Sequence, residues 1–148
     1  MDVFSTLITP VEQAGLWRQG RTEAEIEMKA LAFENAKAPF LATSLRKGRA
    51  RETNIVTDDL PGYSWQQWGE AAQLVWIDST NHLNWSKDWL DKPERLNGYR
   101  ILEKAADKLG LSVTSPHTLV SLRAKTPREI YSVVEIDQEM RQRYGTSR

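Results

Sequence analysis

The chain has 148 residues, and its 20 basic and 20 acidic side chains give a formal net charge of zero. This balance removes the electrostatic reason to expect nucleic acid or an anionic membrane surface as a partner. Cysteine is absent, which excludes disulfides, thiolate metal sites and a cysteine nucleophile. No stretch approaches the roughly 20 apolar residues that span a bilayer, and the N-terminus lacks a secretory signal, so we expect a cytoplasmic protein without membrane contacts.

Helix starts are marked by capping boxes, in which a Ser or Thr cap is followed three residues later by Glu. The boxes begin at Thr9, Thr22, Thr126 and Ser132. The first predicts a helix to about Gln19, the second a helix to about Asn35, and the last a helix that closes the chain near Gly145.

Apolar patterns between these helices predict a small antiparallel sheet and one further amphipathic helix. The predicted strands are Asn54–Thr57, Ala71–Ile77 and His117–Ala124. The amphipathic helix extends from Asn97 to Leu109, and a short helical turn begins at Pro39 and runs through Leu45. We therefore expect one α+β domain over residues 1–148, with a small central antiparallel sheet and helices packed on one of its faces.

The segment from Ser64 to Gln73 has the spacing S-x-Q-x-x-G-x-A-x-Q. This spacing resembles the S-x-H-x-x-G-x-A-x-D signature of the peptidoglycan-cleaving zinc peptidases, a family of D-Ala-D-Ala carboxypeptidases and L-alanyl-D-glutamate endopeptidases. In that family the His and the Asp bind zinc, so the resemblance implies zinc as the usual cofactor. It also implies a hedgehog/D-Ala-D-Ala peptidase-like fold, a bacterial or phage source and, for a cytoplasmic chain, phage-style release.

Three other segments resemble the same family. Gln13–Thr22 is similar to the Q-x-x-L-(W/Y)-x-Q-G-R-T stretch of phage-type members, and Asn97–Leu111 is similar to the helix before the last ligand strand. Pro116-His117 resembles the step that delivers the third zinc ligand. Together with the signature, these segments follow the order of the family through most of the chain.

The departures from the family fall on the positions that carry its chemistry. Gln66 and Gln73 stand where the family has its His and Asp ligands, and Thr114 stands at the position of the acidic general base. Of the catalytic positions only His117 matches. Neutral amides are poor zinc ligands, and without zinc nothing lowers the pKa of a bound water to about 7. We therefore predict no metal site, no cofactor and no hydrolysis by the family mechanism.

The predicted function is recognition of a small peptide, such as a cell-wall muropeptide, in the former substrate cleft. Amides and an imidazole can hydrogen-bond the amide or carboxylate groups of a peptide. The predicted ligand-binding residues are Ser64, Trp65, Gln66, Trp68, Gln73 and His117, with the two tryptophans as walls. Two other interpretations stay open here: the amides satisfy one another in a vacated site, and the tryptophans belong to the core.

Two further classes of function are alternatives. A metal-independent hydrolase would use His117 and Glu70 as a general acid–base pair in the same cleft. A protein-interaction module would use Trp85 and Trp89 as exposed anchors, because tryptophan is enriched at binding hot spots. The basic run Arg46–Arg51 is expected to be a solvated loop and not a phosphate site. The sequence does not determine the oligomeric state.

Overall fold

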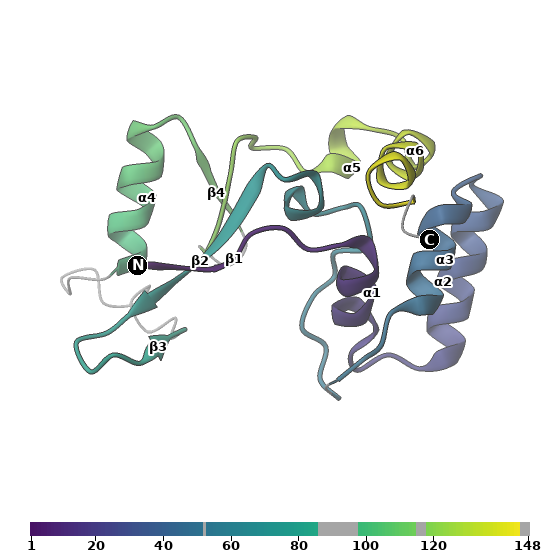
Figure 1. Ribbon diagram of the computed structural model, residues 1–148, viewed down its shortest axis with the longest axis horizontal. Coiled ribbons are helices and arrows are strands. Elements are labelled where there is room, and N and C mark those ends of the chain that lie inside the picture. The colour runs from purple at the N-terminus through teal and green to yellow at the C-terminus, as the bar shows by residue number, and fades with distance from the viewer. Residues whose placement is uncertain (52, 86–97, 115–117, 146–148) are drawn as a thin grey trace. The chain divides into compact units, whose positions relative to one another are not determined.

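A computed structural model describes residues 1–51, 53–85, 98–114 and 118–145 of the chain. It confirms the α+β class: these residues form six α-helices, one 3-10 turn and five strands in an open antiparallel sheet. The chain divides into two compact units, whose elements are labelled in Figure 1. The sheet unit comprises Met1–Thr6 and Glu70–Ala124, and the helical unit comprises Leu7–Gly69 and Lys125–Arg148. The expectation of one domain stays a prediction.

The sheet unit is built around β2 (Ala71–Ile77), which confirms the predicted central strand. The strand order is β1 (Asp2–Ser5), β2, β5 (Leu119–Ser121) and β4 (Ser112–Thr114), and β3 (Leu83–Asn84) also pairs with β2. All of these pairs are antiparallel. In this register Gln73 lies opposite Ser5 on one side and Leu119 on the other, so it occupies the middle of the sheet.

One helix, α4 (Gly98–Lys108), packs against β2 and β4 within the sheet unit (Figure 1). The buried Tyr99 hydroxyl donates to the carbonyl oxygen of Asn84 at 2.6 Å. A Cβ at Gly98 would lie 2.4 Å from the ring of Trp76, so a glycine is needed where the helix begins against the strand. The predicted amphipathic helix is confirmed within the described residues, and it ends at Lys108, one residue before the predicted end.

The helical unit contains α1 (Pro10–Arg18), α2 (Glu23–Asn35), α3 (Pro39–Lys47), α5 (Pro127–Ile130) and α6 (Val133–Tyr144). α3 is the central helix, because α1, α2 and α6 all pack against it; α2 and α3 lie side by side in Figure 1. Leu41 and Leu45 of α3 and Met140 of α6 are fully buried. Burial of each such side chain contributes about 1.5–3 kcal/mol. No described helix is long and apolar enough to cross a membrane.

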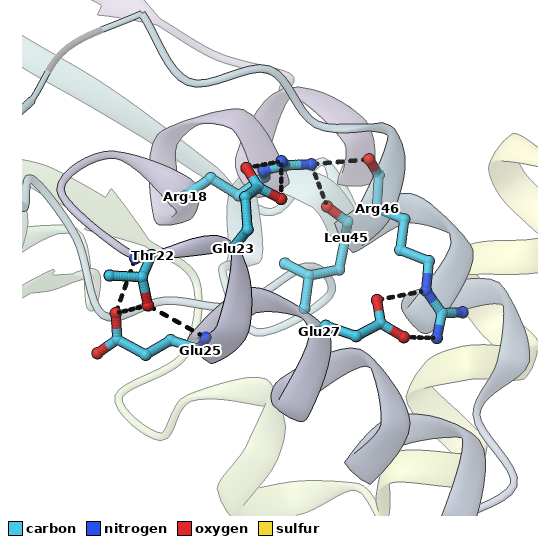
Figure 2. Close-up of polar contacts among 7 residues, drawn as sticks. All are labelled: Arg18, Thr22, Glu23, Glu25, Glu27, Leu45 and Arg46. Atoms are coloured by element: carbon cyan, nitrogen blue, oxygen red, sulfur yellow. Dashed lines mark hydrogen bonds and ion pairs between the residues drawn. The ribbon is translucent and has the colours of Figure 1, made fainter.

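All four predicted capping boxes are formed. At the start of α2 the Thr22 amide donates to Glu25 Oε2 at 2.7 Å, and the Glu25 amide donates to Thr22 Oγ1 at 3.3 Å (Figure 2). Hydrogen bonds from the backbone and then the hydroxyl of Thr22 lower the pKa of Glu25. Each box satisfies backbone donors that a helix end leaves unpaired, which is why a four-residue pattern sets these helix starts.

The predicted strand at Asn54–Thr57 is wrong. Residues 53–60 contain no strand, and Ile55 and Val56 are exposed. The described part of the helical unit contains no strand with which this segment could pair. An apolar run without a partner strand leaves its backbone groups to solvent, so β-propensity alone does not make it a strand.

The helical turn predicted from Pro39 to Leu45 is a longer helix, α3, which extends to Lys47. Its last turn is stabilised by Arg18, whose Nη1 donates to the carbonyl oxygens of Leu45 at 3.4 Å and of Arg46 at 2.7 Å (Figure 2). Such carbonyl groups have no partner within the helix itself. The Gly48 amide donates to the carbonyl oxygen of Ser44 at 3.1 Å, and a guanidinium from α1 completes the capping of this helix end.

Candidate functional site

The predicted site residues fall in both units. Ser64, Trp65, Gln66 and Trp68 belong to the helical unit, whereas Glu70 and Gln73 belong to the sheet unit. His117 lies outside the described residues. The predicted site residues thus belong to two separate units. The convergence of Gln66, Gln73 and His117 stays a prediction.

In the helical unit the signature forms η1 (Trp65–Trp68), a single 3-10 turn with a cap at each end. Ser64 is the N-cap: its hydroxyl accepts from the Gln66 amide at 3.4 Å, and its carbonyl oxygen accepts from the Gln67 amide at 3.0 Å. Gly69 ends the turn in the left-handed region at φ 72°. The turn thus gives the Ser64 hydroxyl a structural role and fixes the backbone of Gln66, which is 6% exposed.

The two tryptophans of η1 are packed in the interior, at 4% exposed for Trp65 and 7% for Trp68. The Trp65 indole donates to the carbonyl oxygen of Lys125 at 2.7 Å, and the Trp68 indole donates to that of Gly62 at 2.9 Å. Trp68 also stacks on Tyr131, with ring centroids 5.0 Å apart and an angle of 11° between the planes. These contacts account for both residues as core packing, and their predicted role as walls of a ligand site stays a prediction.

A buried pair of glutamines ties η1 to α1. The fully buried Gln67 donates from Nε2 to Gln13 Oε1 at 3.0 Å and accepts at Oε1 from the Gly62 amide. Gln13 donates from its own Nε2 to the carbonyl oxygen of Asp59 at 2.6 Å. The sequence did not single out Gln67, because its partner lies 54 residues away and no local pattern links the two. The one sequence feature that pointed to this glutamine pair was the presence of Gln13 in the Gln13–Thr22 motif.

Gly20 and Arg21, from the same motif, hold the segment that leads to η1. Gly20 has φ +71°, and a Cβ there would lie 2.6 Å from the Ile55 amide nitrogen. Arg21 donates to the carbonyl oxygen of Trp17 and, at 2.8 Å, to Asp58 Oδ1, and its guanidinium lies over the Trp17 ring at 4.2 Å. The motif residues therefore act as a scaffold that fastens the chain before Ser64 to the end of α1.

In the sheet unit, Glu70 and Gln73 already have partners. Glu70 Oε2 accepts from Arg123 Nε at 2.7 Å and Oε1 accepts from Nη2 at 3.4 Å, a two-point ion pair. Gln73 Oε1 accepts from the Ser5 hydroxyl at 3.4 Å. The ion pair with Arg123 therefore engages both carboxylate oxygens of Glu70. The predicted pair of Glu70 with His117 stays a prediction.

Trp85, one predicted anchor of an interaction surface, is 41% exposed. Its ring meets that of the exposed Phe4 edge to face, with centroids 4.9 Å apart. Both residues belong to the sheet unit. The second predicted anchor, Trp89, lies outside the described residues, so the predicted interaction surface stays a prediction.

No group of three or more His, Cys, Asp or Glu side chains in the described part of the chain is arranged to hold a metal ion. His82 is described, and its Nδ1 lies 2.9 Å from the Thr80 hydroxyl. Hydrogen bonds from Thr80 and then from the His82 backbone lower the pKa of Asp78. This local turn explains the contacts of His82 without a ligand.

Comparisons with models of protein families, with curated proteins and with solved structures find no match for this chain. The likeness to the zinc peptidases rests on the sequence motifs alone.

Proposed function

We propose that this chain binds a small peptide of the cell-wall type as a zinc-free relative of the peptidoglycan peptidases. The observation that carries the proposal is a contrast between scaffold and chemistry. Gln13 is hydrogen-bonded to Gln67 of the signature turn, Ser64 caps that turn, and Arg21 holds the preceding segment through Asp58. The two positions at which the family binds zinc are instead the amides Gln66 and Gln73.

The donor set does not fit a hydrolytic zinc centre. Such a centre needs about three imidazole, thiolate or carboxylate ligands and an open position for water. Two neutral carbonyl oxygens from Gln66 and Gln73 supply neither the basicity nor the negative charge that this cation requires. Loss of the metal would remove the activated water and with it the family reaction.

Amides suit a peptide ligand because each offers one acceptor and two donors, which matches the donor and acceptor of every peptide unit. The low exposure of Gln66, at 6%, supports a role for its side chain at the base of the proposed site. Hydrogen bonds in such surroundings are stronger than in water, and an unmatched partner is costly. Peptide ligands that leave these amides unpaired should therefore bind more weakly.

Isothermal titration of the whole chain with purified muropeptides of three to five residues tests this function. We expect binding below millimolar dissociation constants, weakened about tenfold in Gln66→Leu or Gln73→Leu, since about 1.4 kcal/mol is one decade of affinity. Gln142→Leu, an exposed residue of α6, is the matched control and should bind as the unchanged chain does. Far-UV circular dichroism checks that each variant is folded.

Absence of binding at about 1 mM, which corresponds to only about 4 kcal/mol, would overturn the proposal. So would equal affinities in all three variants. Elemental mass spectrometry of the purified chain, with and without added zinc, tests the metal separately. Near-stoichiometric zinc that survives dialysis would contradict a zinc-free site.

A further inference from the structure

A pocket of about 720 Å³ lies in the helical unit between α1 and the segment that follows α3. Ile8, Val11 and Leu16 supply apolar side chains to its lining. Three cations also line the pocket: Lys47 at the end of α3, and Arg49 and Arg51 in the segment that follows. Its volume falls in the range of small-molecule sites, about 300–1,000 Å³, which also combine apolar walls with a few polar groups.

Two glycines allow the backbone of α1 and the backbone at the end of α3 to pack in direct contact beside this pocket. A Cβ at Gly15 would lie 2.8 Å from the carbonyl oxygen of Arg49, and a Cβ at Gly48 would lie 2.6 Å from the backbone of Ala14. Any other residue at either position would push the two segments apart. Arg18 adds a hydrogen bond from α1 to the carbonyl oxygen of Arg46 at 2.7 Å. The basic segment is therefore held against α1 and is not a free loop at this point.

The basic run divides into two parts with different roles. The Arg46 guanidinium forms ion pairs with two carboxylates of α2. Its Nη2 donates to Glu27 Oε1 at 2.7 Å (Figure 2), and its Nη1 donates to Glu34. Lys47, Arg49 and Arg51 form no ion pair with any residue of the described chain. Three cations without an ion pair among the described residues give this pocket a local positive potential, although the whole chain is neutral.

The one carboxylate in the lining of this pocket does not cancel the three cations. Of the residues that line the pocket, Glu12 carries the one carboxylate. Its Oε2 accepts from the Thr9 amide at 2.7 Å and from the Thr9 hydroxyl at 2.9 Å, as the capping box requires. Three cations against one engaged carboxylate leave the lining net positive.

We propose that this pocket binds a small amphipathic anion, with a carboxylate or phosphate head on Lys47, Arg49 and Arg51 and a short alkyl chain against Ile8, Val11 and Leu16. Arginines bind such heads through paired donors. The alkyl chain contributes about 0.8 kcal/mol for each buried CH₂. This site shares none of its residues with the proposed peptide site, so the two proposals fail independently.

The test titrates the whole chain with four probes, all below the concentration at which they form micelles. Octanoate and octyl phosphate carry head and chain, octanol carries the chain alone, and inorganic phosphate carries the head alone. We expect both octyl anions to bind at least about tenfold more tightly than the other two probes. The stronger of the two octyl anions then identifies the head group that the site prefers.

Variants assign the binding to the pocket. The triple variant Lys47→Gln, Arg49→Gln, Arg51→Gln should weaken octyl anion binding at least about tenfold and flatten its dependence on salt. Leu16→Ser should weaken the octyl anions but leave inorganic phosphate unchanged. The charge-matched control Lys37→Gln, Lys125→Gln, Arg141→Gln alters three exposed cations of the same unit outside the pocket and should have no effect.

Three results would overturn the proposal: octanol binding as tightly as the octyl anions, inorganic phosphate binding as tightly as octyl phosphate, or unchanged affinity in the triple variant. All substituted residues apart from the partly exposed Leu16 side chain are exposed on the surface, so we expect every variant to fold. Far-UV circular dichroism before each titration checks this.

Discussion

Gln67→Ala is expected to leave two buried polar groups without partners. The Gly62 amide loses the Oε1 to which it donates, and Gln13 Oε1 loses the Nε2 that donates to it at 3.0 Å. Gln67 is fully buried, so water cannot simply take its place at the turn. The converse substitution, Gln13→Ala, leaves Gln67 Nε2 unpaired in the same interior.

The magnitude follows from counting these groups. An unpaired buried donor or acceptor costs about 1–3 kcal/mol, so Gln67→Ala should destabilise the chain by about 4 kcal/mol and Gln13→Ala by about 2 kcal/mol. In the double variant neither Gln13 Oε1 nor Gln67 Nε2 exists, so two of the unpaired groups disappear. At about 2 kcal/mol for each group, the double variant should therefore lose about 4 kcal/mol less than the sum of the single losses.

Urea denaturation, followed by tryptophan fluorescence and by far-UV circular dichroism, measures these free energies of unfolding. Stabilities of about 5–15 kcal/mol are usual for a domain, so the single variants should remain folded. Gln142→Ala, on the exposed side of α6, is the control and should change stability by less than about 0.5 kcal/mol. Additivity of the two substitutions within about 0.5 kcal/mol would refute the coupling between α1 and η1.

Three substitutions test other features of the helical unit. Gly20→Ala and Gly69→Ala both place a side chain at positive φ, which costs about 1–2 kcal/mol. Only at Gly20 does the new Cβ also meet backbone, so this variant should be the less stable in urea; equal losses would contradict the described packing. Burial raises the pKa of Asp137 above 3.8, so its ionisation makes the fold less stable as pH rises through that pKa. Asp137→Asn keeps an oxygen that can accept from the Leu41 amide but removes the charge. The melting temperature of this variant, relative to that of the unchanged chain, should therefore rise from acid to neutral pH. A difference that stays constant with pH would contradict the raised pKa of Asp137.

Helix positions could be predicted from the sequence because their signals are local. A capping box joins residues three apart, and the boxes that begin at Thr9, Thr22 and Ser132 locate α1, α2 and α6. The strand Ala71–Ile77 was equally clear because it is long and apolar. The short β1 and β4 carry too few residues for a period-2 pattern to stand out, and their pairing partners are distant in sequence.

The candidate site was less predictable, for a physical reason. Sequence motifs named its residues by type and spacing, but they do not specify what each side chain contacts. The pairing of Glu70 with Arg123 spans 53 residues, and that of Gln13 with Gln67 spans 54. Contacts at such separations depend on the tertiary fold, which no window of neighbouring residues encodes.

The motif residues also differ in what they reveal about function. Gln13, Gly20 and Arg21 make contacts that the helical unit needs whatever the chain binds, so these positions reveal nothing about chemistry. Gln66 and Gln73 stand at the positions where the resembled family has its zinc ligands, so they are the motif residues on which the proposed function depends. The discriminating experiments therefore substitute these two amides and leave the scaffold intact. A loss of peptide binding with an unchanged unfolding curve would place the function in the amides, because a scaffold defect would alter both.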